Sequence, residues 1–192
     1  MIPQSLTAVC RLARSQRITP APEIQRLALM AATQYDVSLL QMSNSAPLLL
    51  VFLRHAGCTF CREAVADIAA QRKRIEAAGT RIAFVHMCCD TDSEDFFAKY
   101  GLAGIPRVSD PSRHIYRAFG LGRGGLVALF GPRVWWRGFH AGVLRGHGIG
   151  RLMGNGFQMP GVFLVRRGII VRSFRHESSA DRPDYVAFCR MP

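Results

Sequence analysis

The fold is decided by one stretch of the sequence, LLLVFLRHAGCTFC, at residues 48–61. Its first six residues are all hydrophobic, which is typical of a strand that is covered on both faces of a parallel or mixed sheet. Cys58 and Cys61 follow, and residues 61–78 carry hydrophobic side chains on one stripe and charged ones elsewhere. Gly79 stands where a left-handed cap would end a helix. The stretch therefore predicts a buried strand that leads through a Cys-x-x-Cys motif into a helix.

A second buried strand is predicted at residues 81–87, which are hydrophobic on both faces. Strand, helix and strand in this order form a βαβ unit with parallel strands and a right-handed crossover. A β-hairpin is predicted at residues 162–174, where the tight turn 166–168 ends in glycine. The other expected elements are a helix at 23–32, an edge strand at 36–42, a helix with Ser93 as N-cap that ends at Gly101, a helix at 113–119 and a terminal helix at 180–189. This order predicts an α/β protein with a central mixed β-sheet flanked by helices.

The length of 192 residues corresponds to one domain. Hydrophobic residues make up 49% and charged residues 20%, which suits a globular protein with a substantial core. We expect residues 1–22 to be a flexible leader and residues 23–192 to be a single domain. The longest apolar run is far shorter than the roughly 20 residues that cross a bilayer, and residues 1–15 lack a signal-peptide core. A cytoplasmic protein with no membrane partner is expected.

The formal net charge is +12, and the basic residues are Arg except for Lys73 and Lys99. Such an Arg bias indicates a GC-rich coding background. No helix-turn-helix, zinc-finger spacing or aromatic RNA-binding strand accompanies the charge. Nucleic acid is therefore not an expected partner, although the basic C-terminal half could attract anions.

Most of the glycines lie between residues 120 and 161, together with several Arg and no acidic residue. A connection of this length without periodicity is usually functional or an insertion. We expect a Gly/Arg-rich insertion at about residues 120–158, ahead of the strand that follows Pro160.

The two cysteines of the motif are expected to carry the chemistry. Cys58 falls at the start of a helix, where free N–H groups and the helix dipole favour a thiolate. The two cysteines share a helical face and can form a disulfide, with Cys58 as the attacking thiolate and Cys61 as the resolving thiol. Arg54, His55 and Arg62 add positive charge nearby. A zinc site and inert core thiols are the alternatives, but no second Cys-x-x-Cys or His-x3-His exists to complete a zinc site.

Met159 and Pro160 stand immediately before the first strand of the predicted hairpin. In redox folds of this architecture a proline there tends to be cis and to face the active thiols; a trans proline that starts an edge strand is the alternative. Cys88 and Cys89 follow the second buried strand, so parallel strands would bring them to the same sheet edge as Cys58. They are either accessory thiols or ordinary small core residues.

Six short motifs lie along the chain. They are FLRHAGCTFCRE at 52–63, FVHM at 84–87, RVSDP at 107–111, YRAFGL at 116–121, GPRVWWRG at 131–138 and QMPGVF at 158–163. Together they resemble the peroxiredoxin-like branch of the alkyl hydroperoxide reductase and thiol-specific antioxidant (AhpC/TSA) superfamily. The resemblance covers roughly residues 45–190 and implies a thioredoxin-like fold.

The resemblance implies an oxidoreductase that reduces peroxides, with Cys58 at the peroxidatic position. Cys58 would become a sulfenic acid, Cys61 would condense with it to a disulfide, and an external dithiol would reset the pair. The expected partners are a small peroxide, a dithiol reductant such as the thioredoxin or glutathione system, and a second copy of the chain. No bound cofactor and no metal are expected.

The sequence departs from the family at one position. Typical peroxiredoxins have Thr or Ser three residues before the peroxidatic cysteine, and here that residue is His55. They also place an Arg from a distant part of the sequence near the thiolate, and Arg107 or Arg133 could serve as this residue. The remaining residues expected to support the site or bind substrate are Thr59, Phe60, Arg62, Met159 and Pro160.

Two other functions are compatible with the same residues. One is a thioredoxin-like protein disulfide oxidoreductase, in which the loop at Pro160 would bind a peptide. The other is a non-enzymatic redox sensor or anion-binding module that uses the Arg-rich half. Turnover of a protein disulfide would indicate the first, and a salt-sensitive partner without turnover would indicate the second.

Overall fold

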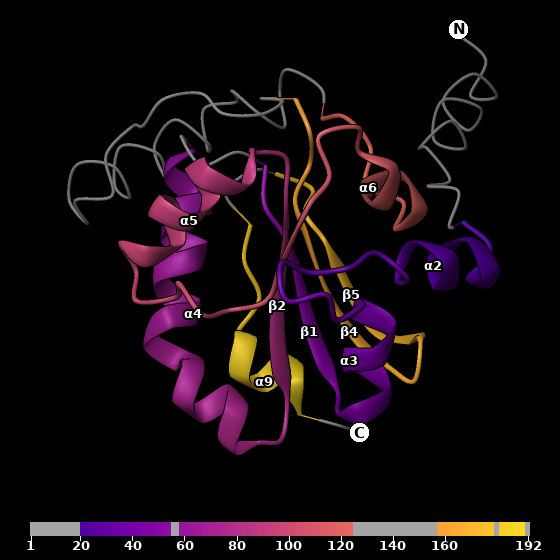
Figure 1. The fold of residues 1–192 in the computed structure, drawn as a ribbon, viewed down its shortest axis with the longest axis horizontal. Coiled ribbons are helices and arrows are strands. Elements are labelled where there is room, and N and C mark those ends of the chain that lie inside the picture. Colours follow the sequence, from indigo (N-terminus) through magenta and orange to yellow (C-terminus); the bar gives the residue numbers. More distant parts are fainter. Residues whose placement is uncertain (1–19, 55–57, 125–156, 179–180, 191–192) are drawn as a thin grey trace, which may run out of the picture.

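The computed structural model describes residues 20–54, 58–124, 157–178 and 181–190. A mixed sheet with the strand order β3-β2-β1-β4-β5 forms the centre of this part of the chain (Figure 1). β1 is parallel to β2 and β2 to β3, whereas β4 is antiparallel to both β1 and β5. The strands are β1 Leu48–Phe52, β2 Arg81–His86, β3 Arg107–Ser109, β4 Gly161–Arg166 and β5 Ile169–Arg175. The predicted βαβ unit and the mixed sheet are confirmed.

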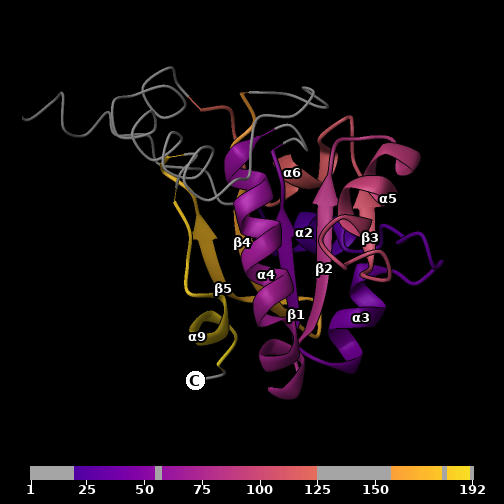
Figure 2. The same ribbon diagram turned by 90° about the vertical axis from the view of Figure 1, so that its left-hand side faces the viewer.

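Helices cover both faces of the sheet (Figure 2). One face packs against the helices α4 Thr59–Ala77, α5 Asp90–Ala98 and α9 Tyr185–Cys189. The other face packs against α2 Pro22–Ala28, α3 Leu39–Ser45 and α6 His114–Ala118. The structure is therefore a three-layer α/β arrangement, as predicted.

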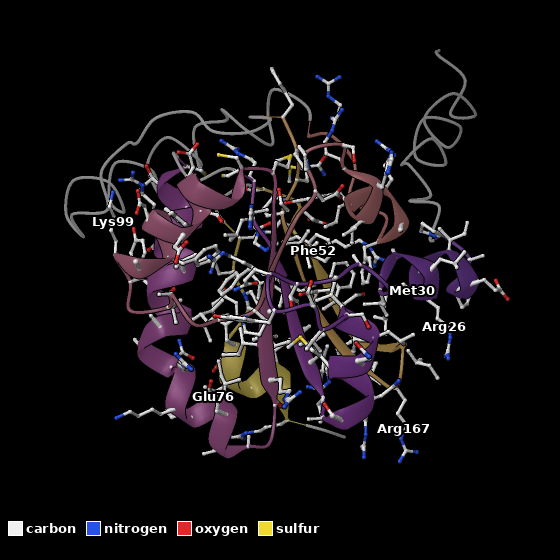
Figure 3. The ribbon with its side chains drawn as sticks, viewed as in Figure 1. Arg26, Met30, Phe52, Glu76, Lys99 and Arg167 are labelled. Carbon is white, nitrogen blue, oxygen red and sulfur yellow. The ribbon has the colours of Figure 1, made fainter. Side chains whose placement is uncertain are left out.

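β1 is the central strand and is buried along its whole length. Its side chains alternate between the two faces, so that Leu49 and Val51 join the core under α4 while Leu50 and Phe52 join the opposite core. Phe52 lies in the middle of the molecule in Figure 3, whereas the charged side chains labelled there lie on the outside. The hydrophobic run at 48–53 was thus a reliable sign of a strand covered on both faces.

Two elements differ from their sequence predictions at the N-terminal side. Residues 36–42 do not form an edge strand, because Ser38 and Gln41 make a capping box that starts α3 at Leu39. The first helix, α2, ends at Ala28 rather than at residue 32. Both segments therefore belong to the helical layer that covers the sheet.

Two helices begin at different residues than predicted. α5 begins at Asp90 with Cys89 as its N-cap, so the prediction of Ser93 as N-cap is wrong. Ser93 lies inside the helix, and its hydroxyl oxygen accepts a hydrogen bond from Arg107 Nε at 3.2 Å. The terminal helix α9 begins only at Tyr185, where the Asp184 side chain accepts the N–H of Ala187 at 3.0 Å.

The predicted hairpin of β4 and β5 is confirmed. Arg167 and Gly168 form its two-residue turn, with φ of 51° and 75°. The N–H groups of both turn residues donate to Ser43, at 2.8 Å to its carbonyl oxygen and 3.1 Å to its hydroxyl oxygen. The turn is thereby fixed against α3.

Most of the predicted insertion at 120–158 lies outside the described residues. None of the described helices has the length and apolar character that crossing a membrane requires.

Candidate active site

The two cysteines of the motif lie where β1 passes into α4. Cys58 is the N-cap of α4 and Cys61 lies in its first turn. Because β1 runs parallel to β2, this point is at the sheet edge where the carboxyl ends of both strands meet. Both thiols are buried, with Cys58 6% and Cys61 4% exposed. The local sequence predicted this placement correctly.

The environment of Cys58 favours a thiolate. A hydrogen bond from the Cys61 side chain is the main cause that lowers the pKa of Cys58 to about 6 from 9.0. Burial opposes this change, while the positive charge of Arg54 and the backbone N–H groups of Cys61 and Phe60 support it. Cys61 itself accepts the backbone N–H of Arg54 at 3.2 Å. These contacts therefore favour the thiolate form of Cys58 at neutral pH.

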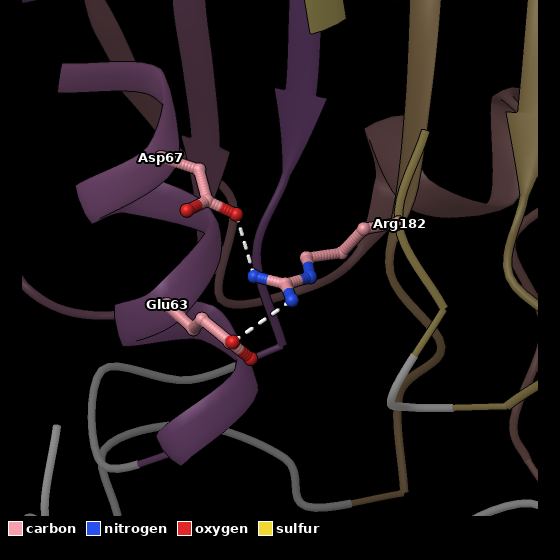
Figure 4. A network of polar contacts seen from close by, with 3 residues as sticks. All are labelled: Glu63, Asp67 and Arg182. Carbon is pink, nitrogen blue, oxygen red and sulfur yellow. Dashed lines mark hydrogen bonds and ion pairs between the residues drawn. The ribbon is translucent and has the colours of Figure 1, made fainter. Parts of the chain in front are cut away.

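An ion-pair network holds the first turns of α4 against the C-terminal segment (Figure 4). The Arg182 guanidinium lies 2.8 Å from a Glu63 carboxylate oxygen and 2.5 Å from an Asp67 carboxylate oxygen. Glu63 is only 2% exposed, so the nearby guanidinium offsets part of the cost of burying its carboxylate. The network fixes the cysteine-bearing end of α4 relative to residues 181–190.

A small cavity of about 20 Å³ lies beside the cysteines, which is room for about one water molecule. Its lining includes Arg54, Cys58 and Cys61 together with Pro160, His176 and Tyr185. The carbonyl oxygen of Pro160 accepts the backbone N–H of His176 at 3.5 Å, which ties the start of β4 to the end of β5 at this wall. The cavity is the place where a small reactant could meet Cys58.

Pro160 lines the same cavity as the two cysteines, and its peptide bond decides between the two alternatives that the sequence left open. All peptide bonds of the described residues are trans, so the trans alternative holds for Pro160. Met159 is buried next to it, and its N–H donates to the carbonyl oxygen of Gly122 at 3.0 Å.

The other predicted site residues have separate positions. Thr59 and Phe60 open α4, and Phe60 lines the cavity; Arg62 follows Cys61 on the same helix. Arg107 lies on β3, where its guanidinium donates to Ser93 and to the carbonyl oxygen of Ala103 and lies 5.8 Å from the Phe97 ring centroid. These contacts stabilise β3 against α5. His55 and Arg133 lie outside the described residues.

Cys88 and Cys89 follow β2 at the same sheet edge, as the parallel strands predicted. Cys88 is buried in the core under α4, whereas Cys89 is exposed and its sulfur lies 3.1 Å from an Asp92 carboxylate oxygen. Within the described parts of the chain, no group of His, Cys, Asp and Glu side chains could hold a metal ion.

Sequence reasoning missed His176 and Tyr185 at the cavity wall. They lie more than 100 residues after Cys58, and no local spacing connects them to the motif. One signal was available: His176 directly follows the second strand of the hairpin. Because the two strands are antiparallel, the end of the second strand lies beside the start of the first, next to Pro160.

The family model for AhpC/TSA antioxidant enzymes matches residues 67–178, more than half of the sequence. The chain belongs to this family. The matched segment begins on α4 after both cysteines, so the match does not include the Cys-x-x-Cys motif. The predicted AhpC/TSA relationship is confirmed by this match. The prediction of an oxidoreductase is confirmed as well, because the family consists of antioxidant enzymes. No curated protein matches the sequence.

Solved structures of peroxiredoxins have the same fold. Peroxiredoxin Q of Xanthomonas campestris superimposes with a TM-score of 0.56 at 19% identity, covering 80% of this chain and 85% of that one. Peroxidoxin BcpB of Mycobacterium tuberculosis gives 0.58 at 15% identity, covering 83% and 89%. The bacterioferritin comigratory protein of X. campestris, studied for alkyl peroxide reduction activity, gives 0.56 at 18% identity, covering 80% and 86%. The predicted thioredoxin-like fold is thereby confirmed.

Proposed function

We propose that this protein is a thiol peroxidase in which Cys58 reduces a peroxide and Cys61 resolves the product. The observation that carries the proposal is the Cys58 environment, in which the Cys61 hydrogen bond and Arg54 lower the pKa of the thiol to about 6. A buried thiolate beside a second thiol and a small cavity has the parts that the reaction needs.

The proposed reaction has three steps. The Cys58 thiolate attacks one peroxide oxygen, so that an S–O bond forms, the O–O bond breaks and the second oxygen leaves as hydroxide or alkoxide, which takes a proton from solvent. The Cys61 thiol then attacks the sulfenic acid, forms the Cys58–Cys61 disulfide and releases water. An external dithiol reduces this disulfide by exchange and becomes a disulfide itself.

Membership of the AhpC/TSA family supports this function. The reductant and the cellular location are further parts of the proposal. A thioredoxin-type or glutathione-type dithiol system is the reductant we propose, in the cytoplasm, where such systems keep thiols reduced. The reaction requires no prosthetic group. The fold of the alkyl-peroxide-reducing relative supports a peroxide as substrate without fixing its size.

Peroxide consumption by the reduced protein tests the proposal. Wild-type protein, Cys58→Ser and Cys61→Ser are each mixed with a small excess of hydrogen peroxide, and the disulfide is located by peptide mass. We expect one peroxide consumed per Cys58–Cys61 disulfide in the wild type, no fast phase in Cys58→Ser, and retained first-step oxidation in Cys61→Ser. Fast consumption that persists in Cys58→Ser would refute the assignment.

Protein disulfide exchange is the second candidate, since Pro160 lines the same cavity as Cys58. In that case the disulfide forms readily from a protein disulfide substrate while reaction with peroxide is slow. Measuring both rates on one preparation separates the two functions.

A further inference from the structure

The outer side of α2 exposes large hydrophobic side chains. Ile24, Leu27 and Met30 are 50%, 67% and 62% exposed. The polar Gln25, in contrast, is buried, and its side-chain amide donates to the Pro20 carbonyl oxygen at 3.2 Å. The three hydrophobic residues follow one another at a spacing of three, which places neighbours on the same side of a helix. Several exposed hydrophobic residues on one side are typical of a binding surface.

Arginine side chains lie next to this surface. Arg26 is exposed on the same helix, and its guanidinium lies over the turn of the β4–β5 hairpin, with Nη1 3.3 Å from where a Cβ on Gly168 would stand. The two residues before that glycine are the exposed Arg166 and Arg167. Glu23 is the only acidic residue of α2, and the turn has none. The surface therefore combines hydrophobic side chains with an excess of positive charge.

The position of α2 leaves this surface accessible. α2 lies at the edge of the molecule in Figure 1, where its inner side packs against α6 and the core of the sheet. Figure 3 shows Arg26, Met30 and Arg167 on this same side of the molecule. The hydrophobic side chains thus project outward from the edge of the structure.

Charge decides which occupant fits. A second copy of the chain would bring Arg26 and Arg167 against the same residues of its partner, and like charges repel. Residues 1–19, which precede α2, contain three Arg and no acidic residue, so they do not supply the opposite charge. The surface of a bilayer that contains anionic lipids offers both negative headgroups and an apolar layer beneath them.

We propose that α2 and the turn of the β4–β5 hairpin bind the surface of a membrane that contains anionic lipids. Ile24, Leu27 and Met30 insert between the headgroups, while Arg26 and Arg167 bind lipid phosphate groups. This binding does not require a helix that crosses the bilayer. It departs from the sequence expectation of no membrane partner, which considered only membrane-spanning segments and a signal peptide. The inference involves neither cysteine, so it is independent of the proposed function.

The layers of the fold determine how the bound protein is oriented. α2 packs on one face of the sheet, whereas α4 and its cysteines belong to the opposite face. A protein bound through α2 therefore keeps α4 on the side away from the lipid.

Co-sedimentation of the full-length protein with vesicles tests the proposal. One set of vesicles contains phosphatidylcholine alone, and the other contains equal parts of phosphatidylcholine and phosphatidylglycerol. We expect binding to the phosphatidylglycerol vesicles to be about tenfold tighter or more, and to weaken at high salt because ions screen the arginines. No binding to the anionic vesicles, or equal binding to both sets, would overturn the proposal.

The variant Leu27→Glu tests the hydrophobic part of the surface. We expect its partition coefficient onto the anionic vesicles to fall about tenfold or more, because the substitution removes the most exposed of the three hydrophobic side chains. Ala70→Glu is the matched control, since it adds the same charge at an exposed position of α4, on the other face of the sheet. A loss of similar size in the control would attribute the binding to net charge and refute a role for α2.

The double variant Arg26→Gln/Arg167→Gln tests the basic part. The partition coefficient should fall about fivefold for each Arg removed, and its dependence on salt should become weaker. Arg74→Gln, at an exposed position of α4, is the control and should bind nearly as the wild type. Equal losses per Arg in the two variants would contradict a localised site.

Three further measurements identify the other possible occupants. Leu27→Glu should change the free energy of unfolding little; a large destabilisation would show that another part of the chain covers α2. A wild-type dimer that Leu27→Glu dissociates in sedimentation velocity would assign the surface to a second copy. Polyglutamate that binds as tightly as the vesicles, with the same loss in Leu27→Glu, would assign it to an acidic polypeptide. Each of these results would overturn the membrane proposal and leave the peroxidase proposal untouched.

Discussion

The two faces of the sheet differ in how their buried polar groups are satisfied. On the face under α2, α3 and α6, the Tyr116 hydroxyl lies 2.5 Å from the Leu53 carbonyl oxygen and 3.0 Å from that of Val85. The buried Asp110 carboxylate there accepts the backbone N–H groups of His114 and Ile115. The face under α4, α5 and α9 instead contains the cysteines, the cavity and the unpartnered groups of His176 and Tyr185.

Both faces have an extensive hydrophobic core with aromatic ring contacts, so the difference between them lies in the buried polar groups and not in the amount of packing. The face under α6 contains a cluster of aromatic rings, in which Phe52, Phe119 and Phe163 lie within 5.4 Å of one another between centroids. Two of these rings pack on Phe52, the last residue of β1. The opposite face contains a buried thiolate and open polar groups, which cost free energy of unfolding.

The largest expected effect comes from the aromatic cluster. Phe119→Ala should lower the free energy of unfolding by about 4 kcal/mol, because Phe119 is fully buried against Phe52 and Phe163. Denaturant unfolding measures the loss, and Tyr35→Ala, at a half-exposed aromatic residue, is the control with a small effect. The pH midpoint of Cys58 alkylation should not change. A shifted midpoint would show that the two faces are not independent.

The next effect concerns the ion pairs of α4. Arg182→Met should lower the free energy of unfolding by about 3 kcal/mol, because it leaves the buried Glu63 charge without its guanidinium. The double variant Glu63→Gln/Arg182→Met should recover much of that loss. Arg72→Met is the matched control, since its pair with Glu76 on the same helix is exposed and contributes below about 1 kcal/mol. Similar losses for the two Arg variants would contradict the role of burial.

His176 should make stability depend on pH. Its pKa is about 4 in the folded chain and 6.5 ordinarily, so the unfolded chain binds more protons between these values. Stability therefore falls as pH drops through this window, by about 2 kcal/mol at pH 5. Denaturant unfolding at pH 7.5 and pH 5 should show a smaller fall in His176→Leu, with His114→Leu behaving as the wild type. An undiminished fall in His176→Leu would disprove this assignment.

Cys58 should set the pH dependence of thiol reactivity. With a pKa of about 6, the thiolate fraction is nearly complete at pH 7.5 and falls about tenfold by pH 5. Iodoacetamide alkylation, followed by peptide mass, should give this profile. Cys61→Ala removes the main cause of the lowered Cys58 pKa, so the pH midpoint of Cys58 alkylation should move to higher pH in this variant. An unchanged midpoint would assign the effect to Arg54 and the helix terminus instead.

The sequence was sufficient where one local pattern decided the outcome. The run at 48–53 and the cysteines that follow it predicted the central strand, the helix and the pair of thiols, because each depends on neighbours in the chain. The Ser38/Gln41 capping box was also local, and it was overlooked in favour of an edge strand.

The cavity wall could not be predicted in this way. His176 and Tyr185 reach Cys58 only through the hairpin of β4 and β5 and the packing of α9 on α4. The strand pairing that brings them there joins segments more than 100 residues apart. No periodicity or spacing in the chain encodes that contact.

Trapping of the first oxidised product tests the central claim most directly. Reduced Cys61→Ser is treated with one equivalent of hydrogen peroxide in the presence of dimedone, which labels sulfenic acids, and the label is located by peptide mass. The label is expected on Cys58. A label on Cys88 or Cys89 instead, or full recovery of the peroxide with no label, would contradict the claim.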